Sequence, residues 1–101
     1  MNGGSVKSED ATIEVLNGSD VVGAAAAKQK TLTQEGLLNI TINDTSYSPS
    51  SSLVWYDTTG GKMPKTQAKL ASVLGKQPAG TTLPSGVEST ANFVVIIGNE
   101  Q

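Results

Sequence analysis

The residues with the clearest chemical potential follow an apolar run in the middle of the chain, where the sequence reads Asp57-Thr-Thr-Gly-Gly-Lys62. A strand, a glycine-rich turn with a lysine and then a helix is how phosphate-binding loops are built. Here, Tyr56 stands where that motif needs its first glycine, and Met63 stands where it needs a hydroxyl. Pro64 has no N–H group to offer a phosphate at the start of the helix. The stretch is therefore interpreted as a strand-to-helix turn.

Other chemical interpretations of the aspartates are also weak. Asp57-Thr-Thr-Gly resembles the Asp-x-Thr-Gly of aspartyl-phosphate enzymes, but those enzymes need further acids and a lysine on a longer chain. Gly18-Ser-Asp-Val-Val-Gly23 lacks the middle glycine of a dinucleotide loop, because Asp20 stands there. We expect Asp20 or Ser19 to cap the following helix.

Asp20 and Asp57 each follow a strand and precede a helix. If the two strands were parallel, both carboxylates would lie at one edge of the sheet, as in a magnesium site. Two acids without a third favour no metal site and no cofactor. A small magnesium-dependent enzyme using Asp57 is kept as a distant alternative.

The composition excludes much chemistry. The 101 residues include no His and no Cys, and all seven basic residues are Lys. Serine–histidine catalysis, zinc fingers and bidentate arginine recognition of phosphate or guanine are therefore excluded. The net charge of −2 gives no attraction to nucleic acid, and no run approaches the roughly 20 apolar residues of a membrane span. We expect a protein that is not an enzyme and has no nucleic-acid partner.

The apolar pattern predicts an α/β fold. Residues 1–10 are small and polar and are expected to be a flexible lead-in, followed by one domain at 11–101. Strands are predicted at 12–16, 38–43, 53–56 and 93–97, with a weak fifth strand at 81–83, and helices at 21–35 and 64–75. We therefore expect a two-layer sandwich with a mixed sheet of four to five strands and two main helices.

The burial pattern of the strands predicts their places in the sheet. Residues 93–97 (FVVII) do not alternate and should be covered on both faces, hence central. Right-handed crossovers predict that the first strand is also an inner strand. Leu38, Ile40 and Ile42 alternate with polar residues, which predicts a strand near the edge with these three side chains inward. The first helix should bury a stripe that includes Val22, Ala25, Ala26 and Leu32, and Gly36 should end it.

Three stretches carry a resemblance to a known family: IEVLNGSDVVGAAAAKQKTLTQEGL, LVWYDTTGGKMPKTQAKLASVLG and ANFVVIIGNE. Together they resemble the C-terminal domain of LytR-type cell-envelope proteins, over nearly all of residues 11–100. The shared features are the Val-Leu-Asn-Gly turn, the small residues of the first helix and the glycines that end the helices. Asp20 and Asn99 depart from the family pattern.

The resemblance implies a location and a role. Such domains lie outside the cytoplasmic membrane of Gram-positive bacteria, after a domain that transfers glycopolymers to peptidoglycan or after only a membrane anchor. We therefore expect an extracytoplasmic, non-catalytic accessory module, anchored through an upstream segment outside these 101 residues. It would bind a cell-wall glycopolymer or an envelope protein, and a structural spacer or oligomerisation domain is the alternative.

The candidate ligand or partner surface is expected at the strand ends. Trp55 and Tyr56 are adjacent, so they should point to opposite faces of the sheet, with Tyr56 the more exposed. Tyr56 and Asp57 are expected to be exposed neighbours of the first turn. The predicted surface consists of Asn17, Gly18, Ser19, Tyr56, Asp57 and Asn99.

Overall fold

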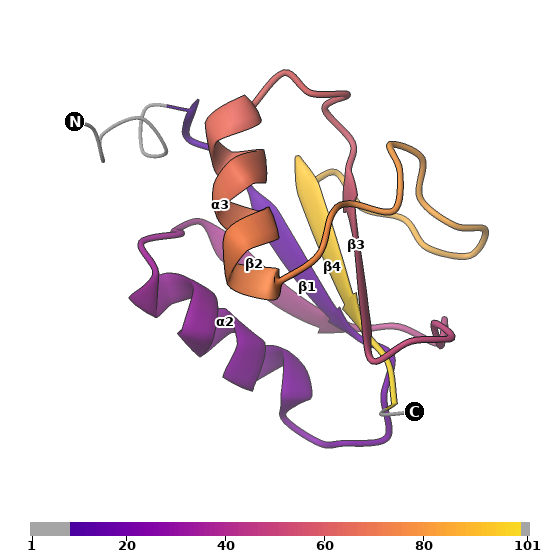
Figure 1. The fold of residues 1–101 in the computed structure, drawn as a ribbon. Helices are drawn as coiled ribbons and strands as arrows, with labels where there is room; N and C mark the ends of the chain where they lie inside the picture. The colour runs from indigo at the N-terminus through magenta and orange to yellow at the C-terminus, as the bar shows by residue number, and fades with distance from the viewer. Residues whose placement is uncertain (1–8, 100–101) are drawn as a thin grey trace.

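A four-stranded mixed sheet forms the centre of the domain in the computed structural model, which describes residues 9–99 (Figure 1). Its strand order is β2-β1-β4-β3. The elements along the chain are β1 (Ile13–Asn17), α2 (Ala24–Gln34), β2 (Ile40–Asp44), β3 (Leu53–Asp57), α3 (Pro64–Leu74) and β4 (Phe93–Ile97). The predicted α/β fold, with a mixed sheet of four strands and two helices, is confirmed. The predicted lead-in lies outside the described residues except for Glu9 and Asp10.

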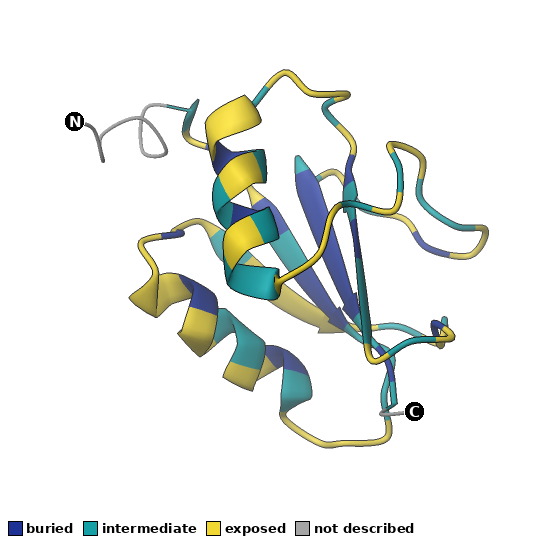
Figure 2. Ribbon diagram, in the orientation of Figure 1, coloured by how far each residue is buried: buried dark blue, intermediate teal, exposed yellow. Residues whose placement is uncertain are grey.

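The two inner strands are β1 and β4, as the unbroken apolar run at 93–97 predicts. β1 runs parallel to both of its neighbours, whereas β3 runs antiparallel to β4. Residues 93–96 are buried on both faces (Figure 2). Strand β2 is at the edge, as predicted.

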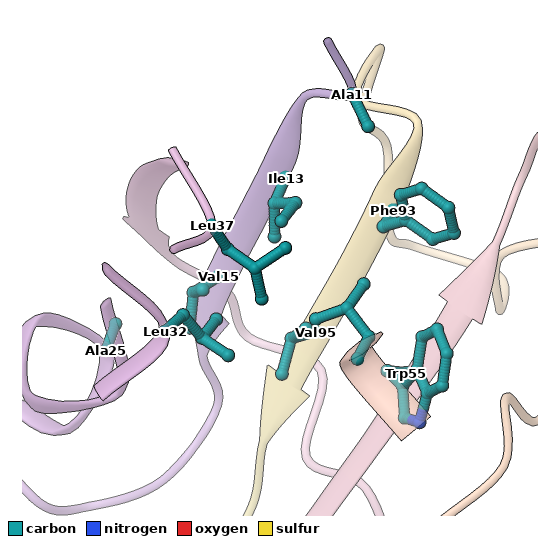
Figure 3. Close-up of a cluster of buried hydrophobic side chains, with 10 residues drawn as sticks. Ala11, Ile13, Val15, Ala25, Leu32, Leu37, Trp55, Phe93 and Val95 are labelled. Atoms are coloured by element: carbon teal, nitrogen blue, oxygen red, sulfur yellow. The ribbon is translucent and has the colours of Figure 1, made fainter. Parts of the chain in front are cut away.

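Both helices cover the same face of the sheet, and the main core lies between these two layers (Figures 1 and 3). The buried members of this core are Ala11, Ile13, Val15, Ala25, Leu32, Leu37, Trp55, Leu70, Phe93 and Val95. The indole Nε1 of Trp55 donates a hydrogen bond to the carbonyl of Lys76 at 2.9 Å, which satisfies its one buried donor.

The opposite face of the sheet carries a smaller core that loops cover. Leu16, Val94 and Ile96 pack there with Val87, and Tyr56 packs against their edge. Trp55 and Tyr56 therefore point to opposite faces, as predicted.

Helix α2 begins later than predicted. Gly23, with φ of 82°, occupies the N-cap position without a side-chain cap, and Val22 is 98% exposed in the preceding turn. Neither Asp20 nor Ser19 caps the helix: the Asp20 carboxylate accepts from Asn99 Nδ2 at 3.4 Å, and the Ser19 hydroxyl accepts from the N–H of Val21, before the helix, at 3.1 Å. The left-handed Gly23 thus separates the turn from the helix, and the predicted roles of Asp20 and Val22 are wrong.

The end of α2 explains an error in the predicted burial of β2. Gly36 adopts φ of 90°, as predicted, and the N–H of Leu37 donates to the carbonyl of Leu32. In this helix-ending motif, Leu37 folds back over Leu32 and is buried. Leu38 is therefore 51% exposed, although it was predicted to point inward. Ile40 and Ile42 lie on the helix-covered face, as predicted, opposite Ile13 and Val15, but Ile42 is still 38% exposed.

Helix α3 matches the sequence prediction at both ends. Pro64 begins it, and Gly75, with φ of 73°, ends it. The predicted fifth strand at 81–83 is not formed; Gly80 makes only an isolated bridge to Tyr56.

The segment from β2 to β3, residues 45–52, crosses the ends of β1 and β4 and requires glycine at two positions. A Cβ atom on Gly18 would overlap the carbonyl oxygen of Tyr47, and one on Gly98 would overlap that of Ser51. The N–H of Gly18 donates to the carbonyl of Ile97 at 2.8 Å, and the N–H of Gly98 donates to the carbonyl of Ser52 at 2.9 Å. These glycines allow the backbones to approach closely.

We predict that Gly18→Ala lowers the free energy of unfolding by about 2–3 kcal/mol, because the added methyl group forces the backbone of residues 45–52 to move. Gly80→Ala is the matched control, since its Cβ would meet nothing within 4 Å, and it should be nearly neutral. Denaturant unfolding monitored through Trp55 measures both. Equal stabilities of the two variants would contradict the close approach at Gly18.

Candidate functional site

The six predicted site residues lie at two opposite ends of the sheet. Asn17 pairs with Ile97 at the end of β4, whereas Asp57 pairs with Phe93 at its start. Because β3 is antiparallel to β4, the end of β3 lies far along the sheet from the end of β1. The prediction that Tyr56 and Asp57 are neighbours of the Asn17 turn is therefore wrong.

The same geometry separates the two aspartates that could have shared a magnesium ion. Asp20 follows β1 and Asp57 ends β3, so the carboxylates do not meet at one edge. Within residues 9–99, no group of three or more His, Cys, Asp or Glu side chains could hold a metal ion.

Asp57 is buried, with 1% of its surface exposed, and not exposed as predicted. Its Oδ1 accepts hydrogen bonds from the N–H and the hydroxyl of Thr59, at 2.9 and 2.5 Å. Its Oδ2 accepts from the N–H of Gly61 at 3.1 Å and from Gln67 Nε2 at 2.7 Å. The carboxylate thus fills the glycine-rich turn from inside, where a phosphate loop would place its ligand.

The charge state of Asp57 follows from these contacts. Burial is the largest influence and acts to raise the pKa, but the hydrogen bonds from Thr59, Gln67 and Gly61 outweigh it together. The pKa of Asp57 is therefore lowered below its ordinary value. The hydrogen-bond donors at the corner between β3 and α3 are therefore already bound to a negatively charged carboxylate.

The carboxylate of Glu9 accepts hydrogen bonds from the first N–H groups of α3. Its Oε1 accepts from the N–H and the hydroxyl of Thr66, at 2.7 and 2.6 Å, and its Oε2 accepts from the N–H of Lys65 at 3.0 Å. Its desolvation acts to raise the pKa, but the hydrogen bonds from Thr66 and Lys65 and the nearby Lys65 ammonium lower the pKa overall. The sequence did not indicate this contact, since Glu9 and Thr66 are far apart in the chain.

Tyr56 is half-buried on the sheet face that the loops cover. Burial raises the pKa of its hydroxyl, and Tyr47 contributes in the same direction. Tyr56 is therefore a packing residue with a partly accessible ring, on the face opposite to the helices.

At the other end of the sheet, the remaining candidate residues build the turn between β1 and α2. Asn17 Oδ1 accepts from the N–H and the hydroxyl of Ser19, at 3.0 and 2.6 Å, and Asn17 Nδ2 donates to the carbonyl of Val21 at 2.9 Å. Asn99, just after β4, accepts a hydrogen bond from the N–H of Asp20 at 2.8 Å and donates one to the Asp20 carboxylate at 3.4 Å. The structure thus brings Asn17, Gly18, Ser19 and Asn99 together as parts of one rigid turn.

An open groove of about 500 Å³ lies beside this turn, between α2 and the strand ends. Lys28 is the one charged residue that lines it, and within residues 9–99 its ammonium makes no ion pair or hydrogen bond. The lining residues are Ser19, Val21, Ala24, Ala27, Lys28, Thr31, Ser52, Leu53, Ile97 and Gly98. The groove therefore combines three hydroxyl side chains, one ammonium group and several apolar side chains.

The sequence analysis placed Ser19 at a site but did not find this groove. One wall is the flank of α2 formed by Ala24, Ala27, Lys28 and Thr31, whose spacing of three and four residues places them on one side of a helix. That spacing was visible in the sequence. The opposite wall joins Ser52 to Gly98, which are distant in the chain and meet only because of the direction of β3.

One comparison with known proteins gave a match. The sequence model of a family described as LytR cell envelope-related transcriptional attenuator matches residues 10–100. Neither the curated proteins nor the solved structures gave a match. Neither helix within residues 9–99 is long and apolar enough to cross a membrane.

We predict that Asp57→Asn lowers the free energy of unfolding at neutral pH by about 2–3 kcal/mol, because a neutral amide cannot accept the same four hydrogen bonds. The folded-state pKa of Asp57 is lowered, so its stabilisation is present above the unfolded pKa of about 3.9 and is lost as pH falls through the folded pKa. Between pH 7 and pH 2, the free energy of unfolding should therefore fall less in the variant than in the unmodified domain.

Glu88→Gln is the control for this series, since it removes the same charge at an exposed position. If Asp57→Asn and Glu88→Gln have the same effect on stability and on its pH dependence, the internal role assigned to the Asp57 carboxylate is incorrect.

Proposed function

Because the chain belongs to the LytR C-terminal domain family, which is associated with the cell envelope, we propose that it is a non-catalytic, extracytoplasmic accessory module that binds a cell-wall glycopolymer. The groove between α2 and the strand ends is the binding site in this proposal. Such a module would hold its protein close to the polymer and leave chemical steps to other domains.

The observation that carries the proposal is the shape and chemistry of the groove. It is open, with a volume of about 500 Å³, and therefore suits an extended chain better than an enclosed small molecule. The hydroxyl of Ser52 and the ammonium of Lys28 can donate hydrogen bonds to sugar or acidic oxygens. Among the described residues that line the groove, Lys28 is charged and none is an acid, which favours a ligand with phosphate or carboxylate groups.

The absence of catalytic side chains supports the non-catalytic part of the proposal. The sequence has no His, Cys or Arg to act as base, nucleophile or oxyanion clamp. The buried carboxylate of Asp57 is already engaged by four hydrogen bonds and lies at the other end of the sheet from the groove. A reaction in the groove would have only hydroxyls and one lysine available.

An envelope protein is the second candidate ligand, and one observation favours it. Val21 and Val22, at the rim of the groove and just beyond it, are 61% and 98% exposed. Adjacent exposed valines suit a protein partner, because their burial on binding is favourable. A polymer ligand and a protein ligand can be distinguished by their dependence on these side chains and on Lys28.

We predict that Lys28→Glu weakens the binding of soluble teichoic-acid fragments by about fivefold or more, because it replaces the single cation of the groove with an acid. Isothermal titration calorimetry measures the affinity. Lys62→Glu is the matched control: it makes the same charge change at an exposed residue of the glycine-rich turn, away from the groove. Muropeptides should be tested beside the teichoic-acid fragments.

Equal losses in Lys28→Glu and Lys62→Glu would show that net charge, and not the groove, controls binding. The proposal is abandoned if neither class of fragment binds the unmodified domain. If an envelope protein binds the domain, and this binding is lost in Val22→Ser but unchanged in Lys28→Glu, the protein partner is favoured over the polymer.

A further inference from the structure

The outer edge of β2 presents unpaired backbone groups. The N–H of Ile13 donates to the carbonyl of Asn39 at 3.1 Å, and the N–H of Thr45 donates to that of Asn17 at 3.2 Å. Backbone groups alternate in direction along a strand, so those of residues 39, 41, 43 and 45 point toward β1. The N–H and carbonyl groups of Ile40, Ile42 and Asp44 therefore point away from the sheet. Within residues 9–99, no strand pairs with this edge.

Proline, lysine and a bulge, which commonly block an exposed edge, are missing from β2, whose sequence is ITIND. Four of its five residues are exposed, as Figure 2 shows for the strand. One contact reaches the edge from α2, where Gln29 Nε2 donates to the carbonyl of Ile40 at 2.9 Å. A carbonyl can accept a second hydrogen bond, so this contact leaves the edge open.

A hollow of about 280 Å³ lies next to this edge, between β2 and the first turns of α2. Ile42, Ala25 and Ala26 line it, together with the polar residues Asn17, Asn43 and Asp44 and with Gly23. Ile42 is 38% exposed, and Ala26 is also exposed. An added strand would place an apolar side chain over this hollow, as in complexes that form by strand addition.

We propose that β2 pairs with β2 of a second copy of this chain, antiparallel and related by a twofold axis at Ile42. In this register Ile42 exchanges both backbone hydrogen bonds with Ile42 of the second copy, and Ile40 lies opposite Asp44 of the second copy. The two sheets become one continuous sheet. The two Ile42 side chains lie side by side on the face that carries the helices.

Charge complementarity favours this register over a shifted one. Ala26 lines the hollow beside β2, and the exposed Lys30, four residues later, lies on the same side of α2. Gln29 contacts Ile40, so this part of α2 is near the start of β2. Asp44 of the second copy is placed opposite that end. Lys30 and Asp44 therefore form two equivalent opposite-charge pairs about the axis, and the two Asp44 side chains stay at opposite ends of the ladder.

The dimer follows from the edge of the sheet and does not depend on the ligand of the groove. Its interface rests on one five-residue strand and is small, so the association is weak and depends on concentration. Pairing would place two grooves in one assembly, and a polymer that reaches both would be held more tightly than by either alone.

Sedimentation velocity and light scattering between about 10 µM and 1 mM test the proposal. The unmodified domain should change from monomer to dimer within this range, and Ile42→Pro should stay monomeric throughout. The N–H of Ile42 points away from β1, so proline removes the dimer bond and leaves the bonds to β1 in place. Circular dichroism and thermal unfolding confirm that the variant is folded.

Charge reversal tests the register. Lys30→Glu and Asp44→Lys should each weaken dimerisation by about three- to tenfold, and the double variant should restore it. Lys62→Glu, away from the edge, is the control and should have no effect. An unmodified domain that is monomeric at every concentration, or a dimer that persists in Ile42→Pro, overturns the proposal. Failure of the double variant to recover overturns the proposed register.

Discussion

The direction of β3 is the constraint on which the arrangement of side chains depends. After β2 ends at Asp44, residues 45–52 carry the chain across the ends of β1 and β4 to begin β3 at Leu53. Eight residues can span three strand spacings of about 4.8 Å, but they cannot also return along the sheet, which takes a crossover of about a dozen residues or more. β3 must therefore start at the same end and run antiparallel. Gly18 and Gly98 permit this crossing, because they leave room for the backbone.

This direction places the two strand-to-helix corners of the domain at opposite ends, where they differ in their electrostatics. The corner after β3 is closed by the carboxylate of Asp57, and the start of α3 is closed by that of Glu9. The corner after β1 is held by neutral amide and hydroxyl groups, chiefly Asn17 and Ser19, and it adjoins a groove lined by Lys28, which makes no ion pair with another described residue. An anionic ligand would therefore meet fewer opposing carboxylates in the proposed groove than at the corner that Asp57 occupies.

Sequence reasoning succeeded where the signal is local. The apolar run of β4, the proline that begins α3 and the glycines that end both helices each act within a few residues, so these features could be predicted. The contacts between Glu9 and Thr66 and between Asp20 and Asn99 join residues far apart in the chain, and no local pattern indicates them. The short connection before β3 was a usable signal, because its length excludes a parallel strand.

We propose that the end of the sheet beside Asn17, and not the glycine-rich corner, binds the ligand. This proposal can be tested by titrating the isotopically labelled domain with a teichoic-acid fragment and following the amide chemical shifts. We expect shifts at Ser19, Lys28 and Gly98 and unchanged signals at Thr59 and Gly61, whose N–H groups are bound to Asp57. Shifts centred on Thr59 and Gly61, with the groove unchanged, would contradict it.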